Sequence, residues 1–418
     1  MTGRAAAEPP RLLIRGARVV DPASGRDGVA DVRVAGGLIE EIGPDLEPRG
    51  GEDVLHLSGV LLVPGLVDPH VHFREPGQER KESIETGAAA AVAGGFTTVL
   101  TMPNTDPVVD DPETVRWILE RSREADGARV RPIAAATEGS RGERPTDAAA
   151  LAEAGAVALS DDGRPIPPAI LGEVLRRAAD AGIPVADHCE DLTLSAGGAI
   201  LAGPAAERLG LKGIPPEAES AAVERDLEVL ARAGGRLHLC HVSTAGSVEL
   251  LRSAKASGLA VTAETTPHHL LLTTDVVEGI GPDAKMNPPL ATEEDRRAVR
   301  AALVDGTIDC VATDHAPHTP REKAAGLAAA PFGVVGLETA FGLLYTEMVE
   351  TGEIDLAELV ERMALAPARA FGLDAGRLEP GAPADLAAFA PDEEWTVDPE
   401  RFRSRSRNTP FAGWRLKG

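Results

Sequence analysis

Residues 66–74 read Leu66-Val67-Asp68-Pro69-His70-Val71-His72-Phe73-Arg74, an apolar run of strand length that ends in polar side chains. Successive side chains of a β-strand point to opposite faces, so His70 and His72 point the same way. Two imidazoles on one side of a strand end make half of a metal site. Two structural histidines would leave the same pattern, so the pair alone does not decide between these readings.

From residue 66 onward, apolar runs of strand length alternate with helical patterns. Eight such runs are present: Leu66–Val71, Thr97–Met102, Val130–Ala135, Ala156–Leu159, Val185–His188, Leu237–Val242, Ala260–Glu264 and Cys310–Thr313. Strand–helix alternation predicts parallel strands joined by right-handed crossovers. Eight units of this kind predict an α/β fold, the closed (β/α)8 or TIM barrel.

Both ends of the chain have a different pattern, with short strands separated by turns of glycine and proline. We therefore expect a small β-sandwich domain built from both termini, with residues 1–64 and 370–418 flanking a barrel at 65–369. Residues 401–407 hold four arginines and are expected to form a solvated loop. The long segment 317–332 has little core pattern and is expected to be a mobile lid.

Further polar side chains follow other predicted strands. His188 ends the fifth run, His241 ends the sixth, Asp314 ends the eighth, and the pair Asp161-Asp162 follows the fourth. Barrel enzymes build their sites at the carboxyl ends of the strands, so these groups are expected to meet. Imidazole and carboxylate suit Zn²⁺, with other first-row metals possible. Six ligands favour two metals that share a bridging ligand, and spacing leaves the choice between Asp161 and Asp162 open.

Several longer motifs carry a family resemblance. They are residues 64–77, Thr101-Met102-Pro103-Asn104-Thr105, Ser160-Asp161-Asp162-Gly163, His188-Cys189-Glu190-Asp191, Thr266-Pro267-His268-His269-Leu270, Lys285-Met286-Asn287-Pro288-Pro289-Leu290, residues 312–318, Pro331-Phe332-Gly333 and Leu378-Glu379-Pro380-Gly381. With these motifs the chain resembles the amidohydrolase superfamily and, within it, the class I bacterial dihydroorotases. The resemblance implies reversible, zinc-dependent cyclisation of N-carbamoyl-L-aspartate to (S)-dihydroorotate and water, in de novo pyrimidine (UMP) biosynthesis.

The resemblance also implies roles for individual residues. Two zinc ions per subunit are implied, one held by His70, His72 and Asp314, the other by His188 and His241, with Asp161 as the bridge. A metal-bridging hydroxide would be the nucleophile and Asp314 the general acid/base. The implied substrate-binding residues are His72, Phe73, Arg74, Asn104, Asn287, His318, Phe332 and Gly333. Arg74 follows His72 by two residues and offers a bidentate fork to a carboxylate.

The lysine distribution separates related enzymes. Hydantoinases, dihydropyrimidinases and allantoinases resemble this chain, but they bridge their metals with a carbamylated lysine near the fourth strand. No lysine occurs here between Lys81 and Lys212, so no carbamylated lysine is expected. The alternatives are another cyclic amidohydrolase of the hydantoinase or allantoinase type, and a non-catalytic scaffold for aspartate transcarbamoylase. The presence of all six ligand positions and Arg74 favours an enzyme.

Composition limits the partners. Lys and Arg number 42 against 66 Asp and Glu, a formal net charge of -24, which argues against nucleic acid or anionic membrane as partners. Three cysteines, no apolar run of membrane length and no signal peptide in residues 1–11 predict a cytoplasmic protein. A homo-oligomer, dimer or higher, is usual in the family, and aspartate transcarbamoylase is a possible partner. Because the substrate that the resemblance implies is an anion, we expect its attraction to be local, with the acidic surplus away from the barrel mouth.

Overall fold

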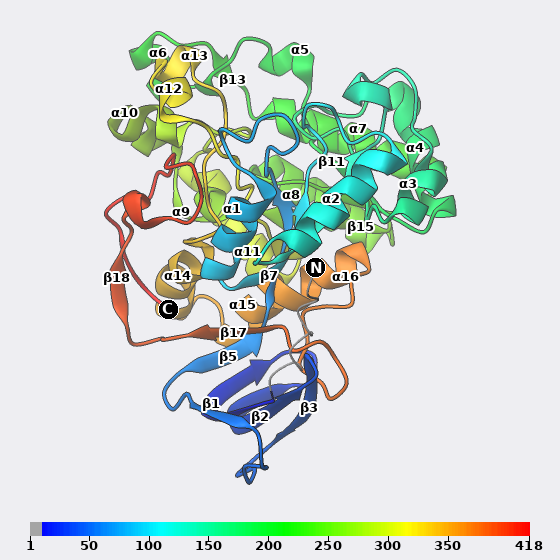
Figure 1. Ribbon diagram of the computed structural model, residues 1–418. Helices are drawn as coiled ribbons and strands as arrows, with labels where there is room; N and C mark the ends of the chain where they lie inside the picture. Colours follow the sequence, from blue (N-terminus) through cyan, green and yellow to red (C-terminus); the bar gives the residue numbers. More distant parts are fainter. Residues whose placement is uncertain (1–10) are drawn as a thin grey trace.

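The computed structural model describes residues 11–418 and confirms an α/β fold with parallel sheets (Figure 1). The expected lack of a signal peptide concerns a stretch that lies almost wholly outside these residues. Among the helices of residues 11–418, none has the length and apolarity needed to cross a bilayer.

The parallel strands follow one another in chain order. They are β6 (Leu66–Val71), β7 (Phe96–Thr101), β8 (Arg129–Pro132), β9 (Ala134–Ala135), β10 (Leu159–Ser160), β11 (Val185–Asp187), β14 (Leu237–Leu239), β15 (Val261–Thr265) and β16 (Cys310–Val311). One sheet pairs β6, β7 and β8, and a second runs from β9 to β16. A parallel bridge joins Val71 to His315, and the His72 N–H donates to the His315 carbonyl at 2.8 Å. The first and last strands therefore lie side by side.

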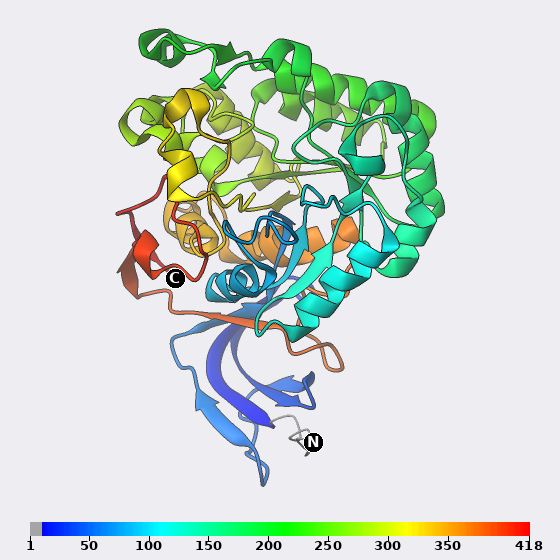
Figure 2. The same cartoon turned by 45° about the horizontal axis from the view of Figure 1, so that its top comes forward.

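Helices cover the outer side of these strands, which Figure 2 shows as an arc of helices around them. The principal ones are α1 (Ile84–Ala93), α2 (Pro112–Glu124), α3 (Ala148–Ala154), α4 (Pro168–Asp180), α7 (Glu217–Ala233), α8 (Ala245–Ala256) and α11 (Glu293–Asp305). Ser83 and Thr292 start α1 and α11 with capping boxes that satisfy free N–H groups of the first turn. In α4, Leu171, Val174 and Leu175 share one buried face, and each contributes about 1.5–3 kcal/mol of burial free energy.

A separate six-stranded sheet contains strands from both ends of the chain. Its members are β1 (Leu12–Asp21), β2 (Arg26–Ala35), β3 (Leu38–Gly43), β4 (Asp53–His56), β5 (Leu61–Pro64) and β17 (Leu386–Phe389). Strand β17 pairs antiparallel with β5, so a segment near the C-terminus closes the N-terminal sheet. The last strands, β18 (Glu394–Thr396) and β19 (Arg415–Lys417), pair only with each other. They lie apart from this sheet, against α14 (Ala340–Leu344).

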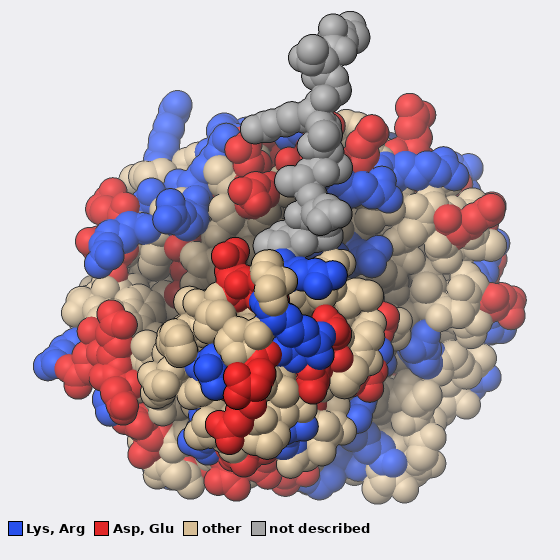
Figure 3. Space-filling model, turned by 60° about the horizontal axis from the view of Figure 1, so that its bottom comes forward, with Lys and Arg blue, Asp and Glu red and all other residues tan. Residues whose placement is uncertain are grey.

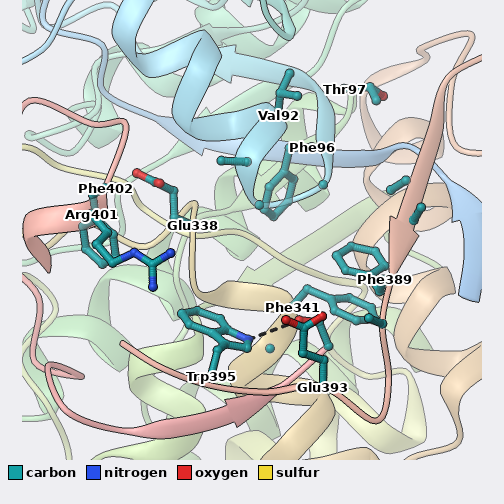
Figure 4. Close-up of a pocket in the computed structure, with 18 of the residues that line it drawn as sticks. Val92, Phe96, Thr97, Glu338, Phe341, Phe389, Glu393, Trp395, Arg401 and Phe402 are labelled. Carbon is teal, nitrogen blue, oxygen red and sulfur yellow. Dashed lines mark hydrogen bonds between the residues drawn. The ribbon is translucent and has the colours of Figure 1, made fainter. Parts of the chain in front are cut away.

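The C-terminal strands leave a cavity of about 490 Å³ against the start of β7 and the end of α1. Figure 4 shows its aromatic lining, which includes Phe96, Phe341, Phe389 and Trp395. Two of its polar side chains are committed to the fold, whereas the buried Thr97 hydroxyl has no hydrogen-bond partner within residues 11–418. The Trp395 indole N–H donates to the Gly418 carbonyl at 3.2 Å, and both carboxylate oxygens of Glu338 accept backbone N–H groups of residues 403–404.

Surface charge is mixed at the end of the molecule that carries the six-stranded sheet. Figure 3 shows acidic and basic side chains interspersed on this face. The net charge of -24 is thus not gathered into one uniform acidic surface at this end.

Candidate metal centre and substrate cavity

A cavity of about 340 Å³ opens at the carboxyl ends of the parallel strands. It brings together most of the polar residues singled out in the sequence. Its lining is His72, Arg74, Asn104, Asp162, Gly163, His188, His241, Asn287, Asp314, Ala316, His318, Pro331, Phe332 and Gly333. These residues lie up to 261 positions apart along the chain, between His72 and Gly333, and the strand order alone brings them to one edge.

One half of the centre is built around His70 and His72, which β6 places on the same side. Asp162 lies 3.4 Å from His70 Nε2 through its Oδ1 and 3.4 Å from His72 Nε2 through its Oδ2. Asp314 Oδ1 lies 3.6 Å and 3.2 Å from the same two nitrogens. Four side chains from three strand ends therefore converge on one small volume.

The other half is formed by His188 and His241 at the ends of β11 and β14. Asp162 Oδ1 lies 3.8 Å from His188 Nδ1 and 3.7 Å from His241 Nε2. These two ring nitrogens are themselves only 2.9 Å apart. Asp162 thus stands between the two pairs of histidines.

The prediction that Asp161 occupies the bridging position is wrong, because the structure places Asp162 there. Asp161 faces the other way, where its carboxylate accepts hydrogen bonds from the backbone N–H and hydroxyl of Thr137. The physical reason is the alternation of neighbouring side chains at a strand end, which lets only one of two adjacent carboxylates face the cavity. Burial raises the pKa of Asp161 in spite of these bonds.

The histidine rings are held in orientation by residues behind them. The His70 Nδ1–H donates to Glu264 Oε1 at 2.7 Å, and the other Glu264 oxygen accepts from His238 Nε2 at 3.0 Å. His72 Nδ1 is 2.9 Å from Asn104 Oδ1. In His70 and His72 this leaves the Nε2 lone pair free on the cavity side, as in histidines that bind a metal.

Sequence reasoning missed Glu264, although the signal was present. It is the last residue of the seventh predicted strand, and the criterion applied to the other strand ends selects it. Glu190, which the sequence offered as a residue that orients a ligand, does contact one: its Oε2 lies 3.0 Å from His188 Nε2, and the Asn287 amide donates to it at 3.1 Å. His188 is thereby oriented by its own strand-end loop.

The charges of Asp162 and Asp314 favour the binding of a cation at this centre. Burial by itself would raise the pKa of Asp162, but His70, His241 and His72 outweigh it and hold that pKa well below its usual value. Burial by itself would also raise the pKa of Asp314. The hydrogen bond to His72 and the charges of His70 and His72 outweigh burial and lower this pKa. Both carboxylates are therefore ionised at neutral pH.

Unsatisfied atoms show that the residues fit a bound metal. His70 Nε2 and Asp162 Oδ1 are fully buried and have no hydrogen-bond partner in residues 11–418. Ligands at about 2.0–2.1 Å from one tetrahedral ion lie about 3.3–3.4 Å from each other. The separations of the Asp162 oxygens from the nitrogens of His70 and His72, 3.4 Å each, match this value. Imidazole and carboxylate donors of this kind suit zinc and other first-row metals.

The substrate side of the cavity carries Arg74 and His318. Burial lowers the pKa of Arg74 to about 10, so it keeps its charge at neutral pH. Burial, together with Arg74 and Lys81, lowers the pKa of His318 to about 2, and its neutral ring donates Nε2–H to the Phe332 carbonyl at 2.7 Å. The cavity thus offers one permanent cation outside the metal centre.

Phe73 does not line the cavity, in contrast to the prediction that it contacts substrate. Its side chain is 2% exposed and belongs to the main hydrophobic core, edge-on to His315. The alternation that turns His72 and Arg74 toward the cavity turns Phe73 away from it.

Backbone strain is concentrated at the same place. Only five non-glycine residues of the described chain have positive φ, and three of them line the cavity: Arg74 at 60°, His241 at 37° and Asp314 at 45°. Such conformations cost about 1–3 kcal/mol each and persist where the surrounding structure enforces them, commonly at functional sites.

Comparison with known proteins agrees with this geometry. The family described as dihydro-orotase-like matches residues 59–247. A dihydroorotase of Bacillus caldolyticus is 50% identical over 388 residues, which cover 93% of this chain and 91% of that protein. A dihydroorotase of Pelotomaculum thermopropionicum is 50% identical over 409 residues, 98% of this chain and 95% of that one. Among solved structures, the L-hydantoinase of Arthrobacter aurescens superimposes with a TM-score of 0.86 at 27% identity, covering 98% of this chain and 93% of its own.

Proposed function

Because the chain belongs to the dihydroorotase family, we propose that it catalyses the reversible cyclisation of N-carbamoyl-L-aspartate to (S)-dihydroorotate and water in pyrimidine biosynthesis. The chain is accordingly a cyclic amidohydrolase. The observation that carries the proposal is the convergence of four histidines and two carboxylates beside Arg74 in one cavity. This arrangement offers cation binding and anion binding in one cavity.

We assign two metal ions, zinc by donor chemistry, to the centre. His70, His72 and Asp314 would hold one, His188 and His241 the other, and Asp162 both. When bound, such ions act as Lewis acids toward a carbonyl oxygen and make water acidic enough to ionise near neutral pH.

Asp314 is the residue we propose for proton transfer. In the hydrolytic direction its carboxylate receives the proton of the attacking water and delivers it to the departing ring nitrogen. In the biosynthetic direction it takes a proton from the carbamoyl nitrogen as the C–N bond forms, and it returns this proton to the oxygen that leaves the side-chain carboxylate carbon as water. Its lowered pKa keeps it ionised, which suits the accepting step, and its second oxygen leaves room for both binding and proton transfer.

The remaining cavity residues bind and orient the substrate. The Arg74 guanidinium would pair with the α-carboxylate, with Asn104 and His318 as further partners on the same wall. Asn287 and the backbone at Phe332 and Gly333 would contact the pyrimidine ring. Arg74 thus supplies the local attraction that an anionic substrate needs in a protein of net charge -24.

A hydantoinase-like activity is the second candidate, favoured by the similarity to a hydantoinase structure. The cavity contains no lysine among the described residues, and Asp162 occupies the central position instead. The single tyrosine, Tyr345, packs against Phe341 and does not line the cavity. A scaffold without activity is disfavoured because the ligand residues converge.

The wider architecture is also part of the proposal. We take the parallel strands as a closed (β/α)8 barrel at residues 65–369. The β-sandwich domain predicted from 1–64 and 370–418 is kept for the N-terminal strands and β17 alone, because β18 and β19 lie apart from that sheet. The first and last strands are adjacent, and β17 joins the N-terminal sheet, which support this division. A cytoplasmic homo-oligomer that associates with aspartate transcarbamoylase is consistent with the family.

One paired experiment tests the function. Metal content and dihydroorotate hydrolysis are measured for the native chain and for Asp314→Asn. We expect the native chain to bind metal and hydrolyse dihydroorotate, and the variant to lose about 10³-fold or more in kcat. Turnover of hydantoin or allantoin by a metal-loaded native chain that leaves dihydroorotate unchanged would overturn the proposal.

A further inference from the structure

One wall of the substrate cavity is held from behind by a buried lysine that does not itself line the cavity. Pro331, Phe332 and Gly333 form this wall, at the end of the segment that the sequence predicted to be a lid. The segment contains the short helices α12 (Pro320–Lys323) and α13 (Gly326–Ala329). Lys323, the last residue of α12, is only 5% exposed. Whether the segment moves stays a prediction.

The Lys323 ammonium group donates only to backbone carbonyls. Its Nζ lies 2.8 Å from the Gly333 oxygen, 3.2 Å from the Pro331 oxygen and 3.3 Å from the Lys285 oxygen. An ammonium group has three donors, so all three are used. No carboxylate pairs with it among these contacts, and burial lowers its pKa to about 8. Burying a lysine ammonium group whose hydrogen-bond acceptors are three backbone carbonyls costs folding free energy. This cost indicates that Lys323 has a role in fixing the position of those carbonyls.

The consequence for the wall follows from peptide geometry. In a planar trans peptide the N–H points opposite to the C=O. Because the Pro331 carbonyl points at Lys323, the N–H of Phe332 points away from it. In the part of the chain that the structure describes, this N–H has no hydrogen-bond partner, whereas the Gly333 N–H donates to the Lys285 carbonyl at 2.9 Å.

We propose that Lys323 is a positioning residue that fixes the Pro331–Phe332 peptide so that the Phe332 N–H faces the substrate. The proposal rests on the proposed function and deepens it, since it explains how a loop wall presents a backbone donor to an oxygen of an anionic substrate. Lys323 touches no substrate in this scheme. It acts through the peptide that it holds.

A second buried side chain supports the same wall from the C-terminal segment. The Asn408 amide donates to the Gly333 and Ala316 carbonyls at 3.0 and 3.2 Å, and its Oδ1 accepts the His318 N–H at 3.2 Å. Lys323 and Asn408 therefore share the Gly333 carbonyl. In the predicted solvated loop 401–407, Arg401, Arg403 and Arg405 are exposed, whereas Ser404 and Ser406 are buried. The chain leads directly from this loop to the Asn408 contact.

The test compares Lys323→Met with the native enzyme, using dihydroorotate as the substrate. We expect KM to rise about 10-fold, with kcat changed less than about 3-fold, because one ground-state and transition-state contact is lost equally. Lys255→Met is the matched control, since its ammonium group also contacts a backbone carbonyl and a polar partner, Gly306 and Asp309, and it does not line the cavity. An unchanged KM in Lys323→Met, or an equal rise in Lys255→Met, would overturn the inference.

Hydrogen exchange of the native chain gives an independent test that needs no variant. The Phe332 amide should exchange rapidly in the free enzyme and become protected when dihydroorotate is added, and Lys323→Met should lose that protection. An amide unaffected by dihydroorotate in an active native enzyme sinks the inference and leaves the function standing. A native chain that does not turn over dihydroorotate would instead remove the proposed function.

Discussion

Two cavities of the described chain differ in how many of their buried polar groups are unpaired. In the cavity of about 490 Å³ beneath the C-terminal strands, Glu338 and Trp395 are already paired with backbone groups, and within residues 11–418 its one buried unpaired side-chain atom is the Thr97 hydroxyl, which faces no second unpaired group there. In the cavity of about 340 Å³ at the strand ends, Asp162 Oδ1 has no hydrogen-bond partner among the described residues. The neighbouring His70 Nε2, directly behind the cavity lining, has none there either. Burying an unpaired polar atom costs about 1–3 kcal/mol, so a site keeps such atoms for a ligand. Convergent unsatisfied groups, rather than volume, identify the reactive cavity.

The largest effect is expected at the carboxylate that joins the two histidine pairs. Asp162→Ala should abolish tight metal binding and lower kcat/KM by more than about 10³-fold, because both halves of the centre lose a ligand. Metal analysis of the purified variant and steady-state kinetics measure both.

Asp161→Ala is the matched control for that change. It removes a buried carboxylate of the same type one residue away, which faces Thr137. It should keep its metal and lose stability instead, by about 1–3 kcal/mol, because the Thr137 donors lose their acceptor. Loss of metal in this variant, with metal retained in Asp162→Ala, would return the bridge to Asp161.

A second effect is expected on substrate affinity. Arg74→Met should raise KM by up to about 100-fold, because a charge-assisted bidentate contact of about 1.5–3 kcal/mol is lost from a buried site. Arg80→Met is the control, since the Arg80 side chain is 63% exposed and, within residues 11–418, forms an ion pair with Glu322 alone. A KM unchanged in Arg74→Met would remove Arg74 from carboxylate binding.

A smaller effect should appear behind the metal ligands. Glu264→Gln keeps the side-chain shape but weakens the hold on His70 Nδ1, and should lower metal affinity about 10- to 100-fold. Titrating metal into the metal-free variant, followed by activity, measures this. Excess metal should restore activity, and an affinity equal to that of the native chain would show that Glu264 has no role in orienting the ligand.

The sequence predicted strand positions and most of the cavity lining because both follow from local pattern. The run Leu66–Val71 matches β6 in both bounds, and the strand-end criterion brought together residues as distant as His72 and Asp314. It failed where direction matters at single-residue resolution: Asp161 against Asp162, and Phe73 beside His72. Alternation of neighbouring side chains excludes Phe73 once His72 faces the cavity, and it allows only one of Asp161 and Asp162 to do so, but it does not say which one. Long-range partners such as Lys323 and Asn408 were also out of reach, because their contacts are with backbone carbonyls.

The smallest effect on catalysis is expected in the larger cavity. Trp395→Leu removes an indole that donates to the Gly418 carbonyl and packs beside Gly342. It should cost about 1–2 kcal/mol of stability, a fall of a few degrees in Tm. The kinetic constants for dihydroorotate should stay within about 2-fold, since no residue that lines this cavity also lines the other. Thermal unfolding and steady-state kinetics on one preparation decide the matter. A 10-fold shift in KM or kcat would mean that the cavity lined by Trp395 is coupled to the cavity at the strand ends. The pairing of polar groups would then no longer distinguish a structural cavity from a functional one.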